Sequence, residues 1–168
     1  MEIKIRSAEF KDIESLMAIS NRDRILYEDR IKEVLEGDFL EFLVIKVDEQ
    51  VVGFSCLVWK QPPKWSPRHP LPQIIDLNIL EQRRGQGIGS RFINYMINLA
   101  KEKGYERLHI GADMEINPRA LDLYKRLGFI QLHDQPKVEK WKFVDSQGKV
   151  FEGQDLVIYL HLSLAEAK

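Results

Sequence analysis

Three alternating glycines near the middle of the chain constrain its fold more than any other feature. They lie in the segment Arg84-Gly85-Gln86-Gly87-Ile88-Gly89, just after the apolar run 73–80 and directly before an amphipathic stretch, residues 90–103. This order predicts a strand, a tight turn and a helix. Main-chain N–H groups at such a helix N-terminus lack partners, and the helix dipole favours negative charge there. Because glycine has no Cβ, a phosphate can approach the main chain, so the segment predicts a pyrophosphate-binding turn.

The spacing of the glycines separates this turn from two common phosphate-binding motifs. A P-loop ends in Gly-Lys-Ser or Gly-Lys-Thr, which this turn lacks. The dinucleotide fingerprint Gly-x-Gly-x-x-Gly lies near the start of a βαβ unit, whereas here the third glycine comes one position early and the turn lies mid-chain. A binder of nucleotide phosphates stays open as one interpretation, and so does a turn that only joins a strand to a helix.

The length and composition of the chain fit one globular domain spanning residues 1–168. Charged residues make up 30% of the chain and hydrophobic residues 44%, which is ordinary for a globular protein. The formal net charge of −1 gives no strong field for nucleic acid, and no apolar run approaches the about 18 residues that span a bilayer. The single cysteine, Cys56, excludes an internal disulfide, and no histidine has metal-ligand spacing. We therefore expect a cytoplasmic protein that binds no nucleic acid, membrane or metal.

The first sixty residues show alternating and helical hydrophobic patterns. Ser7 can cap a first helix, and Gly37 follows a second. The pair Asp48-Glu49 separates two apolar runs and predicts a hairpin. The expected elements are a strand near residues 3–5, helices over 8–19 and 27–35, and strands over 39–47 and 50–59.

A proline-rich segment, residues 60–72, follows the second strand of this hairpin. Its five prolines exclude a helix and a central strand. The segment is either a stiff surface loop or one wall of the site that binds an acceptor substrate. The second interpretation is based on Trp65, Arg68 and His69, whose side chains could stack on a substrate or bind its charge.

The second half of the chain alternates strands and helices. Asn117 and Pro118 predict the start of a helix, as its N-cap and its first helical residue. On this helix Ala120, Tyr124 and Gly128 are four residues apart and share a face, so the tyrosine can bring its hydroxyl to the sheet. A tyrosine packed in the core is the alternative. The expected elements are strands over 73–80, 107–112, 129–132, 138–144 and 156–164, and helices over 90–103 and 117–127.

Taken together, these two motifs closely resemble those of the GNAT acyltransferase superfamily. The turn from Arg84 to Gly89 is similar to its acetyl-CoA loop, and the segment from Asn117 to Phe129 is similar to its second motif. The resemblance extends from Ile3 to about residue 164 and includes the order of strands and helices. It implies an α/β (α+β) GNAT-like fold in a single domain. A mixed, mostly antiparallel sheet of about seven strands would splay between strands 4 and 5 and be flanked by about four helices.

The resemblance implies an N-acetyltransferase that moves an acetyl group from acetyl-CoA to a primary amine by direct attack. Backbone groups of the fourth strand would pair with pantetheine, and Tyr124 would be the general acid to the CoA thiolate. No covalent enzyme intermediate is needed, so the lack of a Ser-His-Asp or Cys-His set is no objection. The implied cofactor-binding residues are Leu77, Asn78, Ile79, Arg84, Gly85, Gln86, Gly87, Ile88, Gly89, Ser90, Asn117 and Tyr124.

The residue that takes the proton of the amine is less well defined by the sequence. Histone-type members of the family carry Glu early on the fourth strand, where this chain has Gln73, and ribosomal-protein-type members carry Glu on the fifth strand, where it has Ala112. Asp76 is the nearest carboxylate on the fourth strand, and with Tyr124 it is a candidate catalytic residue, either as a base or as an anchor for the amine. A structural role for Asp76, bonded to neighbouring backbone, is the alternative.

The acceptor and the assembly are left open by the sequence. We expect the acceptor to be a small-molecule amine or a peptide or protein amine, and paired C-terminal strands make a homodimer possible. A rival interpretation is a non-catalytic acyl-CoA-binding or sensory module, which keeps the glycine turn but performs no transfer. Tyr124 favours the enzyme, because cofactor binding alone requires no acid beside the sulfur.

Overall fold

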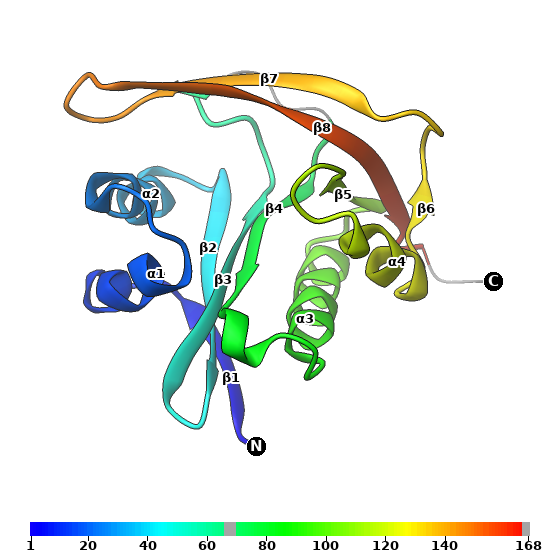
Figure 1. The fold of residues 1–168 in the computed structure, drawn as a ribbon, viewed down its shortest axis with the longest axis horizontal. Coiled ribbons are helices and arrows are strands. Elements are labelled where there is room, and N and C mark those ends of the chain that lie inside the picture. Colours follow the sequence, from blue (N-terminus) through cyan, green and yellow to red (C-terminus); the bar gives the residue numbers. More distant parts are fainter. Residues whose placement is uncertain (66–69, 166–168) are drawn as a thin grey trace.

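The computed structural model describes residues 1–65 and 70–165 and shows a curved sheet with helices on both faces (Figure 1). The sheet has eight strands among these residues, in the order β1-β2-β3-β4-β5-β8-β6, and β7 pairs with β8. Only β4 and β5 are parallel, which confirms the predicted mixed, mostly antiparallel sheet. The strands are β1 (Ile3–Ser7), β2 (Leu40–Val47), β3 (Gln50–Val58), β4 (Gln73–Ile79), β5 (Arg107–Asp113), β6 (Ile130–Gln131), β7 (Lys137–Val144) and β8 (Val150–Ser163). The α-helices are α1 (Ile13–Ile19), α2 (Arg24–Glu36), α3 (Ile88–Glu102) and α4 (Arg119–Arg126), and the 3₁₀ turns are η1 (Phe10–Asp12) and η2 (Glu81–Arg83).

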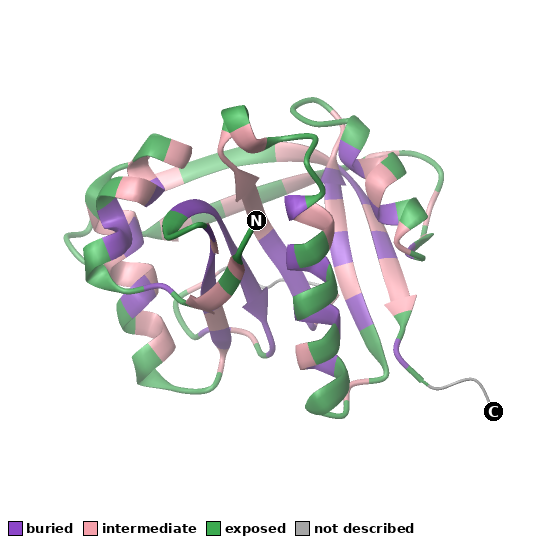
Figure 2. Ribbon diagram, turned by 90° about the horizontal axis from the view of Figure 1, so that it is seen from below, coloured by how far each residue is buried: buried purple, intermediate pink, exposed green. Residues whose placement is uncertain are grey.

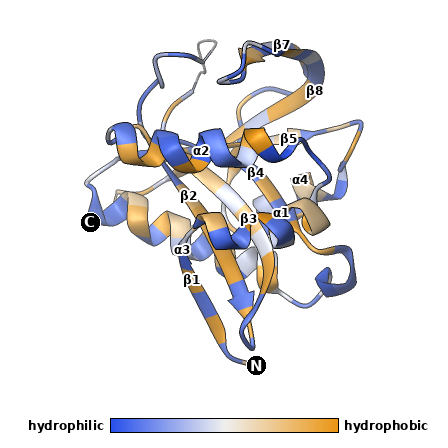
Figure 3. Cartoon of the chain, turned by 90° about the vertical axis from the view of Figure 1, so that its left-hand side faces the viewer, coloured by the Kyte–Doolittle hydropathy of each residue, from blue (hydrophilic) through white to orange (hydrophobic). Residues whose placement is uncertain are grey.

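Two apolar cores lie on the two faces of the sheet. The first contains Leu16 of α1 and residues of α2, and the second contains Phe92 of α3 and residues of α4. Because side chains alternate along a strand, Val58 of β3 belongs to the first core and its neighbour Leu57 to the second. Figure 2 shows buried residues concentrated in the central strands, and Figure 3 shows α2 lying across the strands on the first face. The name "α1–α2 side" is used below for that first face.

The turn between β2 and β3 confirms the predicted hairpin. Asp48 and Glu49 adopt φ angles of 47° and 72°, the left-handed conformation that two-residue hairpin turns need to match the twist of their strands. β1 completes this end of the sheet by pairing antiparallel with β2.

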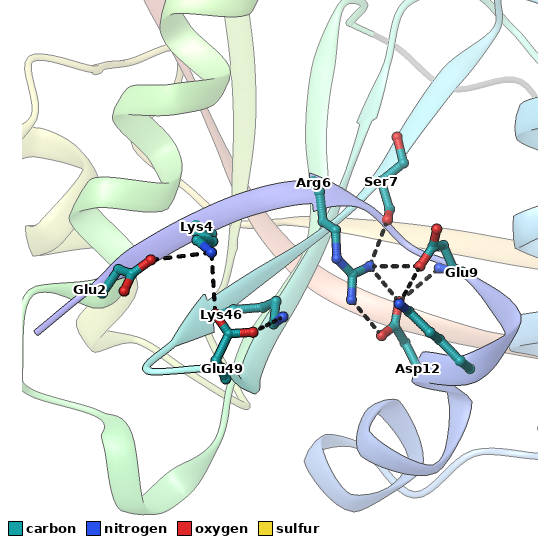
Figure 4. A network of polar contacts seen from close by, with 9 residues as sticks. Glu2, Lys4, Arg6, Ser7, Glu9, Asp12, Lys46 and Glu49 are labelled. Atoms are coloured by element: carbon teal, nitrogen blue, oxygen red, sulfur yellow. Dashed lines mark hydrogen bonds and ion pairs between the residues drawn. The ribbon is translucent and has the colours of Figure 1, made fainter.

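The first helix begins later than the sequence predicts. Ser7 ends β1 and caps no helix, and the 3₁₀ turn η1 comes before α1. The buried Asp12 carboxylate organises this start by accepting hydrogen bonds from the Glu9 amide at 2.8 Å and from two Arg6 nitrogens at 2.8 and 2.9 Å (Figure 4). Although burial opposes its charge, the hydrogen bonds from Arg6 hold the pKa of Asp12 below its usual value. A partner on β1 therefore sets the helix start, which a local pattern cannot indicate.

Three further element boundaries differ from the predicted ones. α2 begins three residues earlier than expected, at Arg24, and α3 begins two residues earlier, at Ile88. β8 begins at Val150, six residues before the predicted strand, because its first half pairs with β7 in a long hairpin arm.

The β7–β8 arm extends over the molecule toward α2 (Figure 1). At its turn the amide of Ser146 donates to Asp29 Oδ2 at 2.8 Å. Nearby, Lys149 Nζ lies 2.8 Å from Asp23 Oδ2. The arm thus joins the β5 half of the sheet to the α1–α2 side.

Candidate functional site

The parallel strands β4 and β5 pair over a very short length. Their registered pairs are Gln73 with His109 and Ile74 with Ile110, and β4 then continues to Ile79 beside β3 alone. The sheet therefore splays between its fourth and fifth strands, as the sequence predicts. The predicted pantetheine-binding residues lie on the separated part of β4, where they are half-buried: Leu77, Asn78 and Ile79.

A bulge bends β4 where it leaves β5. Cys56 of β3 pairs with Ile75, but Phe54 pairs with Asn78, so β4 has one residue more than β3 across this step. Asp76 takes up the extra residue with a left-handed φ of 56°. Aspartate is among the few residues that adopt this conformation readily. Bulges increase local bending, so Asp76 marks the position at which β4 turns away.

The glycine turn has the backbone conformation that its sequence predicts. Gly85 and Gly87 have φ angles of 76° and 81°, which strain any residue with a side chain. A Cβ built on either glycine or on Gly89 meets no atom within 4 Å, so the turn borders open space. Arg84 ties the turn to β4, because its Nε donates to the carbonyl oxygen of Ile79 at 3.0 Å.

The main-chain amides of this turn have no partners within the part of the chain that the structure describes. The first hydrogen bond of α3 runs from the Arg91 amide to the Gly87 carbonyl at 3.2 Å. Among residues 1–65 and 70–165, no acceptor is found for the amides of residues 85–90. Six consecutive donors thus lie in the turn before α3 and in its first residues, near the positive end of the helix dipole, which favours an anion. The cofactor-binding roles of Arg84 and of residues 85–90 stay predictions.

The helix that carries the tyrosine starts later than expected. The predicted N-cap role of Asn117 is wrong, because α4 begins at Arg119 and no side chain caps it. Asp113 Oδ1 accepts hydrogen bonds from the amides of Glu115 and Ile116 at 3.0 and 3.1 Å, and these bonds organise the turn that leads into α4. The exposed Asn117 side chain has no hydrogen-bond partner in the described part of the chain, and its predicted contact with the cofactor stays a prediction.

Tyr124 lies on the inward face of α4. The residue is 6% exposed and its ring packs beside Phe129, with centroids 6.3 Å apart. Burial raises the pKa of Tyr124 to about 12, so the hydroxyl is protonated at neutral pH. Within the described residues the hydroxyl has no hydrogen-bond partner, and it is not among the enclosed polar atoms, so it reaches solvent. Because β4 and β5 are parallel, the starts of α3 and α4 lie at the same end of the sheet.

The other candidate catalytic residue, Asp76, is held by arginines on the α1–α2 side. Both of its oxygens accept hydrogen bonds from Arg22 at 3.0 Å, and Arg30 Nη1 lies 3.5 Å from Oδ2. Arg30 Nη1 also lies 2.9 Å from the sulfur of Cys56. Burial raises the pKa of Cys56, so this sulfur is a neutral thiol and Asp76 is the anion beside Arg30. Cys56 is completely buried and packs in the core on this side of the sheet.

The proline-rich segment contributes an aromatic ring to the same side. The guanidinium carbon of Arg30 lies 4.6 Å from the centroid of the Trp65 ring, a cation–π contact. Arg68 and His69, which the sequence also suggests for the acceptor wall, lie outside the described residues. Sequence reasoning missed Arg22 and Arg30, because a charged residue near or on a helix usually faces solvent and no local pattern distinguishes these two.

Two kinds of feature are not found in residues 1–65 and 70–165. No helix there is long and apolar enough to cross a membrane. No group of three or more histidine, cysteine, aspartate or glutamate side chains there is arranged to hold a metal ion.

Comparisons with known proteins were made by sequence and by structure. The family model described as Acetyltransferase (GNAT) family matches residues 8–129. A thialysine N-epsilon-acetyltransferase from Bos taurus is 36% identical over 99 residues, which are 59% of this chain and 54% of that protein. A putative ribosomal protein bS18-alanine N-acetyltransferase from Bacillus subtilis is 30% identical over 96 residues, 57% of this chain and 58% of that protein. The chain thus spans just over half the length of these curated relatives.

A solved structure shares the fold over almost the whole chain. It is a putative acetyltransferase from Salmonella typhimurium with its cofactor acetyl-CoA, and it matches 98% of this chain and 95% of its own with a TM-score of 0.64. The sequence identity is 17%, so this similarity shows the fold alone.

Proposed function

The chain belongs to the GNAT acetyltransferase family, and from that premise we propose that it moves an acetyl group from acetyl-CoA to a primary amine, with Tyr124 as the acid for the leaving thiolate. The family uses acetyl-CoA, and the chain is an acetyltransferase of this kind. The observation that carries the finer proposal is the run of amides at residues 85–90 without acceptors among the described residues, which follows η2 at the end of the strand that separates from β5.

The glycine turn fits the diphosphate of coenzyme A. Hydrogen bonds to a charged acceptor are shorter and stronger than those between neutral groups, and six donors at a helix start can surround two phosphates. The open space beside Gly85, Gly87 and Gly89 allows the phosphates to approach the main chain. Arg84 would hold the turn against the end of β4.

The separated part of β4 fits the thioester end of the cofactor. Among the described residues, Leu77 to Ile79 have no strand beside them on the β5 side, so main-chain groups there are available to pantetheine, apart from the Ile79 carbonyl that accepts from Arg84. An N–H group on this edge can also stabilise the negative charge that develops on the thioester oxygen during attack. The amine would approach from the α1–α2 side, where the charged and aromatic side chains gather.

Tyr124 would act on the sulfur as the thiolate leaves. Its pKa of about 12 lies about 3.5 units above that of an ordinary thiol, about 8.5. Each unit corresponds to about 1.4 kcal/mol, so complete proton transfer is uphill by about 5 kcal/mol in the unliganded site. Donation of a hydrogen bond to the developing thiolate is therefore the larger part of the proposed role.

Asp76 is proposed to anchor the ammonium group of the acceptor. Its two oxygens already accept hydrogen bonds from Arg22, which suits an electrostatic contact better than proton abstraction. An incoming ammonium would share the carboxylate with Arg22, which lies 32% exposed at the edge of the site.

The acceptor is proposed to be a primary amine on a small molecule or on a peptide or protein. The printed names of the two relatives support this range, since one specifies the epsilon nitrogen of thialysine and the other an alanine of a ribosomal protein. The expected cytoplasmic location, homodimer, single-domain boundary and lack of nucleic-acid partners stay predictions.

Replacing Tyr124 by phenylalanine tests the proposal. Release of free thiol from acetyl-CoA is followed over a panel of amines, and acetyl-CoA affinity is measured by calorimetry. In Tyr124→Phe we expect kcat to fall about 100-fold or more, as is usual for loss of a general acid, with acetyl-CoA affinity retained. The exposed Tyr95 of α3 provides the matched control, Tyr95→Phe, with unchanged kcat. Acetyl-CoA binding with no thiol release for any amine would instead indicate the non-catalytic binding module.

A further inference from the structure

Strands β4, β5 and β8 carry different chemistry on their two faces. On the face under α3 and α4, the registered residues Ile74, Ile110 and Leu160 are all buried in the apolar core. The next registered row lies on the opposite face, because side chains alternate along a strand. This row is polar on all three strands and consists of Gln73, His109 and His161.

The polar row lies on the α1–α2 side, at the point where the sheet splays. Gln73 is registered with Val58, which belongs to the core under α1 and α2. Gln73 with His109 is also one of the two parallel pairs that precede the separation of β4 from β5. Three residues further along β4, Asp76 meets Arg22 on the same side. The row therefore lies on the same face as the proposed acceptor position, three residues along β4 from Asp76, and at the opposite end of β4 from the glycine turn.

The protein leaves polar atoms of this row without partners. The Gln73 side chain is 4% exposed, and its Oε1 has no hydrogen-bond partner among the described residues. The Nδ1 atom of His161 is likewise enclosed and unpartnered there. Enclosed polar atoms in native proteins nearly always bond to protein, water or ligand. Two such atoms in one registered row mark a polar environment inside an otherwise apolar part of the sheet.

His109 has the protonation state of a base. Its Nδ1 lies 3.1 Å from the Pro72 carbonyl oxygen, which can only accept, so Nδ1 carries the proton and Nε2 keeps a lone pair. Burial lowers the pKa of His109, and the positive charge of a protonated His161 or of Arg107 opposes a second charge. The ring of His161 is stacked 6.1 Å away. Among described residues these are the charged and titratable groups that act on His109, and the neighbouring Gln73 is neutral.

We propose that His109 is the proton acceptor for the amine substrate, with the neighbouring Gln73 and His161 forming the polar surroundings of its ring. This rests on the proposed function. An amide cannot take a proton at neutral pH, so Gln73 has no such role itself. His109 accepts the proton at Nε2 either directly or through one bound water.

The proton count of the reaction balances with this assignment. One N–H bond of the ammonium breaks, and the proton goes to His109. The amine nitrogen then bonds to the acetyl carbon while the carbon–sulfur bond breaks, and a second amine proton reaches the sulfur by way of Tyr124. His109 then returns its proton to solvent, so one proton is released for each acetyl group transferred.

The dependence of kcat/KM on pH tests the proposal in His109→Asn, whose side chain can still donate to the Pro72 carbonyl. In the wild type we expect an acid limb with a midpoint below the ordinary histidine value of about 6.5 and a plateau above it. In His109→Asn we expect kcat/KM to be about 100-fold lower at pH 7, and to keep rising toward the pKa of the amine itself. His133→Asn is the control, because both His133 ring nitrogens already contact protein groups, Gln135 and Tyr159. An unchanged profile shape in His109→Asn overturns the proposal.

Two further readouts separate this inference from the proposed function and from misfolding. If no amine in the panel causes the wild type to release thiol from acetyl-CoA, the proposed function fails. If the wild type does release thiol and His109→Asn keeps the plateau of kcat/KM, only the role of His109 fails. NMR titration of the histidine C2 protons needs no turnover: the His109 midpoint should lie below about 6.5 in the wild type and rise in His161→Asn, which removes the opposing charge. A midpoint that is ordinary and unaffected by His161 contradicts the pairing, and the same spectra report whether each variant is folded.

Discussion

The two sides of the molecule at the point where β4 and β5 separate present different chemical groups, main-chain amides on one side and side chains on the other. On the proposed cofactor side, the turn after β4 presents main-chain amides, and its glycines leave these amides accessible because they have no side chains. On the α1–α2 side, the proposed acceptor site consists of side chains from separate elements, among them Arg22, Asp76 and His109. Main-chain groups bind one constant ligand in the same way whatever the side chains are. A site of side chains can change its substrate by substitution without altering the fold.

This contrast predicts that substitutions on the two sides change different constants. Changes in the glycine turn should weaken the binding of acetyl-CoA and leave the KM for the acceptor amine unaltered. Changes on the α1–α2 side should raise the KM for the acceptor amine and leave the binding of acetyl-CoA unaltered. A substitution that changes both constants together would break the comparison.

The largest effect is expected for Gly87→Val. The left-handed φ of 81° strains a branched residue, and the new side chain occupies the space in which phosphate would lie. Loss of two charge-assisted hydrogen bonds, at about 1.5 kcal/mol each, weakens acetyl-CoA binding about 100-fold. Calorimetry with acetyl-CoA measures this loss. The control Gln86→Ala keeps the main-chain amide and changes only an exposed side chain, so its affinity for acetyl-CoA should stay within about twofold of the wild type. An equal loss of affinity in both variants would show that side chains bind the cofactor.

A smaller effect is expected for Asp76→Ala. The substitution removes the carboxylate between Arg22 and Arg30 and puts alanine in a left-handed conformation. Loss of one ionic contact with the acceptor, about 1.4 kcal/mol, raises the acceptor KM about tenfold. Asp76→Asn tolerates the same φ and keeps one acceptor oxygen, so its KM should rise less. Steady-state kinetics at saturating acetyl-CoA give both values, and an acetyl-CoA affinity that falls with the acceptor KM argues against separate sides.

The smallest kinetic effect is expected far from both sites, for Arg6→Gln. This change removes the bidentate bond to buried Asp12 and should lower the free energy of unfolding by about 2 kcal/mol while kcat and both KM values stay the same. The folded-state pKa of Asp12 is lowered, so its stabilisation is complete above the unfolded value of about 3.9 and is lost as pH falls through the folded value. Urea unfolding at several pH values should therefore show a constant difference from the wild type above about pH 5 and a shrinking one below pH 4. A difference that grows on acidification contradicts the assigned role of Asp12.

The cofactor side was the part of the molecule that the sequence could predict. Its determinants are consecutive: glycines between Gly85 and Gly89, an apolar strand before them and an amphipathic helix after them. Backbone conformation is set locally by such residues, so spacing alone indicates the turn. The hairpin at Asp48-Glu49 was predictable for the same reason.

The α1–α2 side could not be predicted because its contacts join distant residues. Arg22 and Asp76 are 54 positions apart, and Arg30 and Cys56 are 26 apart. The start of α1 depends similarly on Arg6 of β1, and the first half of β8 is a strand because β7 pairs with it. In each case the controlling partner is supplied by the fold, and the local pattern carries no record of it.

The most direct test of the central claim is an amide NMR titration with two ligands, coenzyme A and pantetheine, which lacks the diphosphate. If the main-chain donors hold the diphosphate, the amide resonances of residues 85–90 should shift strongly downfield with coenzyme A and little with pantetheine. The resonances of residues 77–79 should respond to both ligands. Saturation by coenzyme A with no response from residues 85–90 would contradict the account.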